Sequence, residues 1–254
     1  MKNQNKFGVS YRIGFSGLMP DNSISLPQLM SHVQEASLFH TLSIPGGFDY
    51  YDKMSWVWIL THWQVEIKSY PKVGDKIIVE TWPVRFKSYF GERSFEARNT
   101  QGDVLLIANS NWILLDRKTF KPVRPTEEMC EKYGGCFPFP MQKDFALPKA
   151  EGYEALCEHS YTPTRRDIDT NDHVNNVKYL EWLYCHIPEE IYNSHHVRKL
   201  KVAYKKETLL GDELKIKILN AKTVGASDVE IFAIVEKDGQ AATEIYTVWT
   251  RNGE

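Results

Sequence analysis

Two stretches of the chain carry apolar side chains at intervals of three and four residues, which is the spacing of one face of a helix. In the stretch 26–42 the side chains at these intervals are Leu29, Val33, Ala36 and His40. In the stretch 176–187 they are Val177, Leu180, Tyr184 and Ile187. Pro188 follows the second stretch, and its ring prevents a helix from continuing. We therefore expect one helix in each half of the chain.

Each predicted helix is followed by segments in which apolar and polar side chains alternate, as in strands that bury one face. Glu213–Leu219 places leucine and isoleucine on one face and lysine on the other, and Lys76–Thr81 matches it in the first half. Val229–Glu236 and Glu244–Arg251 follow, and the Asp-Gly dipeptide in 237–240 signals a hairpin turn between them. A helix followed by strands in each half predicts the α+β class.

The two halves are related by a repeat of 137 positions. This one offset relates four pairs of residues: Gly74 and Gly211, Gly102 and Gly239, Trp112 and Trp249, Val65 and Val202. Identical residues in one register over such a length indicate duplicated structural units. We expect an N-terminal unit at 1–124 and a C-terminal unit at 160–254. The proline-rich segment 125–159 between them is expected to be an irregular linker with a short helix at Thr126–Tyr133.

Composition narrows the class of protein. The chain has 254 residues, 42% hydrophobic and 25% charged, and its net charge of −2 gives no indication of a nucleic-acid partner. The cysteines form no zinc motif, so we expect reduced thiols, no metal and no cofactor. They are Cys130, Cys136, Cys157 and Cys185. The chain starts without an apolar leader and has no apolar run near the ~20 residues of a membrane span. We therefore expect a cytoplasmic protein without membrane insertion.

One segment is dense in side chains that can do chemistry. Asp169, Asn171 and His173 stand two positions apart, so in an extended chain they would project from one face and form a cluster. A predicted helix begins just after them, near Asn175, and free backbone N–H groups at a helix start can bind developing negative charge. Such residues also form loops and helix caps, and the pattern supports the two interpretations equally. The first-half counterpart, 18–25, lacks the histidine and the spacing, which favours a functional role in the second half.

Glu207 is a second candidate. It follows the predicted strand Leu200–Tyr204, from which a carboxylate could approach the Asp169 segment. Its neighbours are lysines, and the pattern alone favours a solvated strand end.

The sequence resembles the plant and bacterial acyl-acyl carrier protein thioesterases from about Tyr11 to Arg251. The second half carries the string DIDTNDHVNNVKY at 167–179, followed by IPEEI at 187–191. The first half agrees at WVW in 56–58, Gly74-Asp75 and ETW in 80–82. The resemblance implies a tandem hotdog fold, in which two long helices are each wrapped by an antiparallel sheet.

The resemblance also implies an activity. Members of this family release free fatty acids from acyl carrier protein, and the family's catalytic positions fall on Asp169, Asn171, His173 and Glu207. Some members have a cysteine beside the glutamate, but this chain has Thr208 there, so a cysteine nucleophile at that place is excluded. Attack by water with Glu207 as base and direct attack by Asp169 both remain open.

Further expectations follow from that activity. The N-terminal unit is expected to bind the acyl chain, with Trp56, Trp58, Met54 and Ile59 as candidate lining residues, and Asn175 is expected to contact substrate. The acidic carrier, with its phosphopantetheine-linked acyl chain, calls for a basic docking face. Our candidates are Arg165, Arg166, Lys205 and Lys206.

Other readings remain open. They are a thioesterase for acyl-coenzyme A, a hydroxyacyl dehydratase of the same fold and a non-catalytic acyl-binding protein. The sequence is compatible with a monomer or a homodimer.

Overall fold

The computed structural model describes residues 6–134, 136–220 and 228–252. Predictions that touch residues 1–5, 135, 221–227, 253–254 or the side chain of Cys130 lie outside the described part. The chain divides into two compact units, which are described one at a time. The first unit comprises Met1–Ile24 and Leu29–Asp144, and the second comprises Ser25–Gln28 and Phe145–Glu254.

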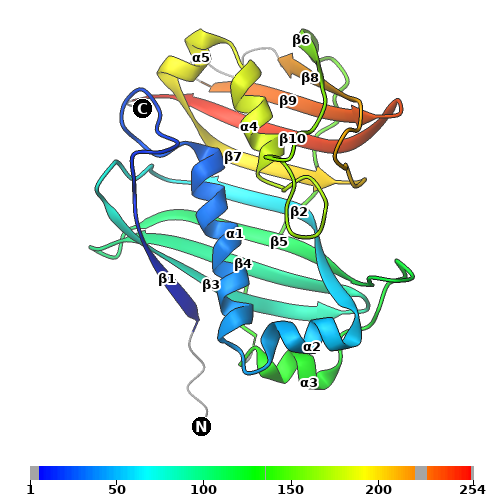
Figure 1. Cartoon of the computed structure of the whole chain (residues 1–254). Helices are drawn as coiled ribbons and strands as arrows, with labels where there is room; N and C mark the ends of the chain where they lie inside the picture. The colour runs from blue at the N-terminus through cyan, green and yellow to red at the C-terminus, as the bar shows by residue number, and fades with distance from the viewer. Residues whose placement is uncertain (1–5, 135, 221–227, 253–254) are drawn as a thin grey trace. The chain divides into compact units, whose positions relative to one another are not determined.

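Five antiparallel strands form the framework of the first unit. They follow the order β1-β3-β4-β5-β2. Their bounds are β1 (Phe7–Arg12), β2 (Trp56–Ile67), β3 (Lys76–Lys87), β4 (Phe90–Asn99) and β5 (Val104–Asp116). Three helices accompany them: α1 (Leu26–Ser43), α2 (Gly47–Met54) and α3 (Glu127–Lys132). In Figure 1, α1 lies across one face of these strands.

The predicted first helix is confirmed, and its periodic positions explain its placement. The side chains of Leu29, Val33 and Ala36 have no accessible surface, and that of His40 is buried. Burial of this apolar stripe against the sheet supplies most of the stability of such a helix.

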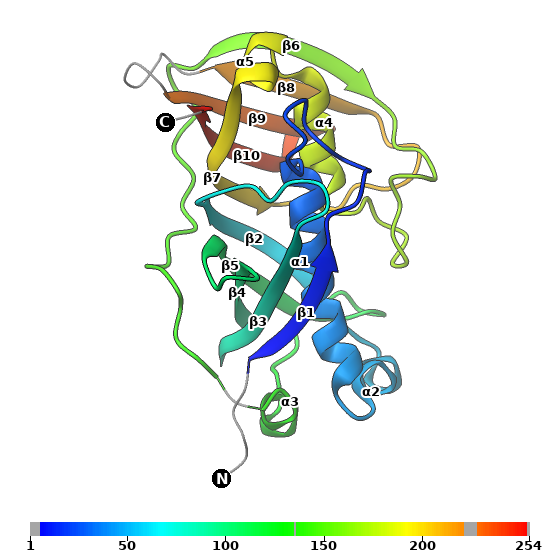
Figure 2. The ribbon, with the colours of Figure 1, turned by 90° about the vertical axis from the view of Figure 1, so that its left-hand side faces the viewer.

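The second unit repeats this plan with five more antiparallel strands in the order β7-β10-β9-β8-β6. The strands are β6 (Glu154–Tyr161), β7 (His195–Tyr204), β8 (Leu214–Asn220), β9 (Asp228–Lys237) and β10 (Gln240–Arg251). The helices are α4 (Lys178–His186) and α5 (Glu189–Ser194). Figure 2 shows β1 beside β3 in the first unit and β6 beside β8 in the second.

The helix of the second unit is shorter than its counterpart. α4 has 9 residues and α1 has 18. Pro188 sits two positions after the end of α4, where its ring and missing N–H stop the helix as expected. The chain restarts at once as the short α5, with Pro188 as its N-cap residue.

The sequence repeat is also a structural repeat. Trp112 donates its indole N–H to Ser110 Oγ at 2.7 Å, and Trp249 donates to Thr247 Oγ1 at 2.8 Å. The turn between β9 and β10 has Asp238 and Gly239 with φ of 53° and 70°, the backbone of a tight hairpin. The duplicated halves therefore share the strand order and this tryptophan contact.

The connection between the units is partly regular. α3 forms where the short helix was predicted, and Thr126 Oγ1 caps it by accepting from Met129 N at 3.1 Å. The expectation of an irregular chain up to residue 159 is wrong, because β6 begins at Glu154. β6 lies at an edge and buries few side chains, so its sequence shows little alternation.

In the described part of the chain, no helix is long and apolar enough to cross a lipid bilayer.

Candidate functional site

The segment 168–174 forms a tight turn, not the extended chain in which the three candidate side chains would cluster on one face. Ile168 pairs with Val174 as an isolated bridge, and Asp169 N donates to His173 O at 2.8 Å. Asp172 adopts a left-handed φ of 63°, which aspartate tolerates better than most residues. The turn reverses the chain, so the three candidate side chains do not share one face.

The carboxylate of Asp169 holds this turn together. Its Oδ1 accepts from the backbone N–H of Asn171 at 2.8 Å and from that of His173 at 3.4 Å. Such side-chain to backbone bonds are typical of Asx turns. Asn171 lies exposed at the tip of the turn. The structure therefore joins Asp169 to the backbone of His173 and does not bring Asn171 to the imidazole.

The imidazole of His173 meets the carboxylate of Glu207. His173 Nε2 lies 3.0 Å from Glu207 Oε2, and the two side chains remain 25% and 43% exposed. The loops that carry them are fastened together, because Val174 N donates to Thr208 O at 2.9 Å and His173 pairs with Leu209. This is a histidine–carboxylate pair that is held in place yet open to a substrate.

A buried layer of hydroxyl groups supports the pair. Thr208 is 1% exposed, and its Oγ1 is hydrogen-bonded to the hydroxyl of Tyr179 on α4. Tyr204, at the end of β7, donates to Asn176 O at 3.0 Å. Burial raises the pKa of both tyrosines, so both hydroxyls stay protonated. Thr208 thus helps to fix the position of the adjacent Glu207.

Asp167 is a buried anchor that our sequence reasoning missed. Its Oδ2 accepts from Thr164 N at 2.7 Å, from Thr164 Oγ1 at 2.8 Å and from the hydroxyl of Tyr161 at 2.9 Å. Burial alone would raise the pKa of this carboxyl, but the three hydrogen bonds outweigh it and hold the pKa below its usual value. The Thr-x-x-Asp spacing was the available signal, since threonine and aspartate often bond across such turns.

Most backbone N–H groups near Asn175 are already engaged. Asn175 N donates to Asp167 O at 2.8 Å, Val177 N to Asn175 Oδ1 at 2.9 Å, and Lys178 N to Asn175 O at 2.9 Å. Of the amides at 174–178, all of them described, only that of Asn176 donates to no protein acceptor. Asn175 therefore shapes the start of α4, and Asn176 offers the free donor.

A matching loop in the first unit lacks this chemistry. Leu18 pairs with Ile24, Met19 N donates to Ser23 O at 2.8 Å, and Asn22 has a φ of 64°. Ile24 N donates to Pro71 O at 2.9 Å, as Val174 N does to Thr208 O. By this correspondence Met19, Ser23 and Tyr70 stand where the second unit has Asp169, His173 and Glu207.

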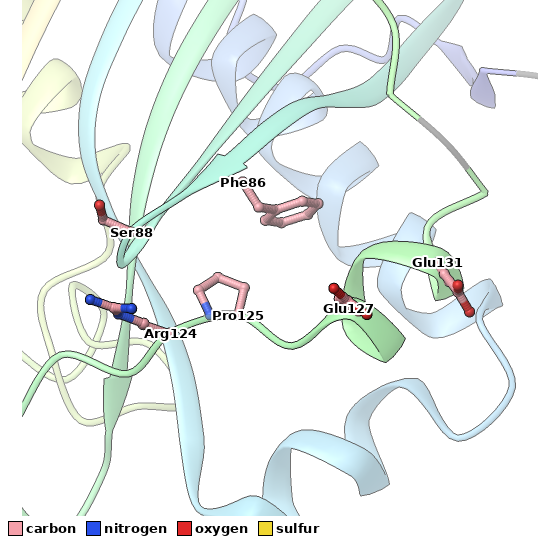
Figure 3. A pocket seen from close by; sticks show the side chains of 6 residues that line it. All are labelled: Phe86, Ser88, Arg124, Pro125, Glu127 and Glu131. Atoms are coloured by element: carbon pink, nitrogen blue, oxygen red, sulfur yellow. The ribbon is translucent and has the colours of Figure 1, made fainter.

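The remaining candidates lie in both units. Trp56 and Trp58 belong to the first unit, where both pack half-buried against a cluster that includes Tyr51. Neither lines the hollow of about 590 Å³ in that unit (Figure 3). The hollow is lined by Phe86, Ser88, Arg124, Pro125, Glu127 and Glu131. The four basic docking candidates are all exposed: Arg165, Arg166, Lys205 and Lys206.

A metal site is not formed by the residues described, since no three of their His, Cys, Asp or Glu side chains converge.

Comparison with known proteins places this arrangement in a family. The family models described as the acyl-ACP thioesterase N-terminal and C-terminal domains match residues 4–133 and 150–251. A palmitoyl-acyl carrier protein thioesterase of Gossypium hirsutum is 32% identical over 215 residues, which cover 78% of this chain and 50% of the relative. A dodecanoyl-[acyl-carrier-protein] hydrolase of Cinnamomum camphora is 28% identical over 218 residues, 81% of this chain and 56% of the relative. The chain spans about half the length of these relatives.

Solved structures show the same fold. The 12:0-ACP thioesterase from Umbellularia californica superposes with a TM-score of 0.84 at 24% identity, covering 97% of this chain and 94% of the other. An acyl-ACP thioesterase from Bacteroides thetaiotaomicron gives 0.81 at 20% identity, covering 95% and 96%. These superpositions confirm the predicted α+β tandem hotdog fold, and the two family models, which match most of the sequence, show that this chain belongs to the acyl-ACP thioesterase family.

Proposed function

We propose that this protein hydrolyses the thioester of fatty acyl-acyl carrier protein and so releases a free fatty acid. The observation that carries the proposal is the 3.0 Å contact between His173 Nε2 and Glu207 Oε2 in a chain of this family. The duplicated loop without that pair supports a single reactive centre, in the second unit.

Thioester hydrolysis needs few catalytic groups, provided that the protein holds them in the right positions. A thioester is an activated acyl group and its thiolate leaves readily, so a base, a water molecule and an oxyanion donor suffice. In our proposal Glu207 takes a proton from the water that attacks the carbonyl carbon. The carbon–sulfur bond then breaks, and the proton passes to the departing thiolate.

His173 acts in this scheme by holding the base. With Glu207 ionised, the N–H at His173 Nε2 donates to Oε2, which leaves Oε1 free to receive the proton of water. The free N–H of Asn176 is the proposed oxyanion donor, positioned by Asn175. Asn171, which is exposed, is proposed to contact the carrier-linked part of the substrate.

Asp169 has a structural part in the proposal. One oxygen of its carboxylate already accepts from two backbone N–H groups, which disfavours its use as a nucleophile. Hydrolysis in oxygen-18 water under single turnover separates the two routes. Label in the fatty acid of the first turnover supports attack by water, whereas label in Asp169 supports an acyl-anhydride.

The first unit is proposed to bind the acyl chain, because its own loop lacks the reactive pair. The exposed Arg165, Arg166, Lys205 and Lys206 are proposed to bind the acidic carrier. Lys205 pairs with Glu244 at 2.7 Å, which leaves the two arginines as the stronger candidates.

The test is a direct assay on the whole chain. Acyl-ACP and acyl-coenzyme A of matched chain lengths are supplied, and free thiol and free fatty acid are measured. We expect thiol to be released faster from acyl-ACP than from acyl-coenzyme A. We expect Glu207→Gln to abolish this release, and the control Glu213→Gln, which changes an exposed glutamate of the same unit, to retain it. Equal or faster thiol release from acyl-coenzyme A indicates an acyl-coenzyme A thioesterase. Double-bond formation without thiol indicates a dehydratase, and binding without reaction indicates an acyl-binding protein.

Two further expectations remain predictions. Cell fractionation tests the cytoplasmic location, and light scattering tests the choice between monomer and homodimer.

A further inference from the structure

Arg93 lies in the interior of the first unit. On β4 its side chain shares a face with Phe95 and Ala97, which have no accessible surface, and only 9% of the surface of Arg93 itself is accessible. The acidic residues nearest to it in sequence, Glu92 and Glu96, project from the opposite face, because side chains alternate along a strand.

Those two carboxylates already have cationic partners. Glu92 pairs with Arg85 and Lys143, and Glu96 pairs with Arg98. Among the described residues, no carboxylate lies within salt-bridge distance of Arg93. Burial lowers the pKa of Arg93, but a guanidinium keeps its proton in proteins. A buried charge without a counter-ion is strongly unfavourable, so an anion that pairs with it is stabilised.

The hydrogen bonds of Arg93 show which donors remain. Its Nη1 donates to His40 Nδ1 at 3.0 Å and to Thr81 Oγ1 at 3.1 Å. Burial and the charge of Arg93 lower the pKa of His40 to about 3, so the imidazole is neutral and accepts. Nη1 has thereby used both of its N–H groups. The N–H groups of Nε and Nη2 meet no acceptor among the described residues, and together they form the edge that binds carboxylates bidentately.

The hydroxyl groups beside Arg93 are already committed to one another. Thr41 Oγ1 donates to Ser37 O, so the hydroxyl of Tyr133 must be the donor in its 3.2 Å bond to Thr41. Trp58 donates to the hydroxyl of Tyr51, which in turn donates to Tyr133 at 2.8 Å. Because every proton of this chain is used, Nε and Nη2 of Arg93 are the donors left for a ligand.

The surroundings combine this polar edge with aromatic walls. The guanidinium carbon of Arg93 lies 5.2 Å from the ring centre of Tyr133, whose ring is 6.1 Å from that of Phe86. Phe86 also contacts Trp58 and lines the hollow of Figure 3. Tyr51 and Tyr133 each keep 7% of their surface accessible, so the interior here is less tightly closed than around Phe95.

We propose that the first unit holds a binding site for an aliphatic carboxylate, whose two oxygens pair with Nε and Nη2 of Arg93 and whose alkyl chain packs on Trp58 and Phe86. No residue of the reactive pair takes part. If the proposed function holds, the product is itself such a carboxylate, and a released fatty acid would occupy the first unit.

The first test measures binding to the whole chain without turnover. Decanoate, kept below its micelle concentration, is titrated by calorimetry and compared with decan-1-ol. We expect saturable binding of decanoate, and binding of the alcohol weaker by about tenfold or more, because the alcohol leaves the guanidinium unpaired. Equal affinity for the two probes, or no binding of decanoate, overturns the proposal.

Variants locate the site. Arg93→Met is expected to weaken decanoate binding by about tenfold or more. The control Arg98→Met, on the same strand but with a side chain that is 38% accessible and paired with Glu96, is expected to retain it. Glu207→Gln is also expected to retain it. If Glu207→Gln weakens binding while Arg93→Met does not, decanoate occupies the reactive centre and the proposal is wrong.

A third readout covers the case in which Arg93→Met does not fold. Trp58→Phe is expected to lose part of the fluorescence change that decanoate causes in the parent protein while calorimetric binding persists. An unchanged fluorescence response in Trp58→Phe would place the ligand elsewhere. Because each measurement records binding, failure of this proposal is distinguishable from failure of the proposed hydrolysis.

Discussion

Ser23 and His173 hold the same backbone position in the two units, but their side chains meet different carboxylates. Ser23 Oγ donates to Asp21 of its own loop at 2.6 Å, whereas His173 Nε2 lies 3.0 Å from Glu207 of a neighbouring loop. Met19 N donates to Ser23 O and Asp169 N to His173 O, both at 2.8 Å. The same loop is therefore built twice, with a hydroxyl in one copy and an imidazole in the other. Tyr70 stands in the first unit where Glu207 stands in the second, so the duplicated scaffold carries the histidine–glutamate contact in the second unit and not at the matching position of the first.

The contact between His173 and Glu207 predicts a kinetic signature. His173→Asn and Glu207→Gln should each lower kcat by about 10²–10⁴-fold, the usual range for removal of general acid–base help. The double variant should be little worse than either single one, because the two side chains act as a unit. Stopped-flow thiol release gives the rates, and additive losses in the double variant would show independent roles.

Charge reversal at Arg165 and Arg166 should weaken carrier binding. We expect the double variant Arg165→Glu/Arg166→Glu to raise KM for acyl-ACP by about tenfold or more with little change in kcat. We also expect KM of this variant to depend less on salt concentration than KM of the parent protein. Lys215→Glu, at a position 60% exposed on β8, is the matched control. The same rise in KM for the control would mean that net charge, not a docking face, is responsible.

Gly47 should tolerate no side chain, because a Cβ there would lie 2.0 Å from the carbonyl oxygen of Thr41. We expect Gly47→Ala to lower the free energy of unfolding by about 3 kcal/mol, the upper end for overpacking, since backbone atoms cannot turn aside. Gly14→Ala, where nothing lies within 4 Å, should change it by about 0.5 kcal/mol or less. Urea denaturation of the two variants measures the contrast, and equal losses would contradict the close approach.

His40 should make the first unit sensitive to acid. Its folded pKa of about 3 lies below the 6.5 of an unperturbed histidine, so between these values the unfolded chain binds a proton that the native chain does not. Its contribution to stability is complete above pH 6.5 and is lost as the pH falls, by up to about 1.4 kcal/mol per pH unit. His40→Gln should flatten the curve of unfolding free energy against pH over this interval. Parallel curves for the two proteins would show that folding does not change the pKa of His40.

The sequence by itself determined the repeat, the helices α1, α3 and α4, and the strands β3, β7, β8, β9 and β10, whereas α2 and α5 were not predicted. Positions such as Leu29 and Val33 recur with the period of a helix, and the Gly74 and Gly211 turns recur at one offset, so these features are written locally. β6 was not predicted, because an edge strand buries few side chains and does not need alternating apolar and polar residues.

Only the tertiary structure decided how the candidate residues meet. Asp169 and Asn171 looked like neighbours of His173 because their spacing suits an extended chain, but a left-handed residue at Asp172 turns the loop. Glu207 reached His173 because a backbone hydrogen bond from Val174 fastens two loops far apart in sequence. Likewise, no periodicity shows that Arg93 lacks a counter-ion. Hydrophobic periodicity depends on neighbours along the chain, so the periodic helices and strands were predictable. Contacts between distant segments depend on the packed fold, so the candidate residues could be named from the sequence but their geometry could not.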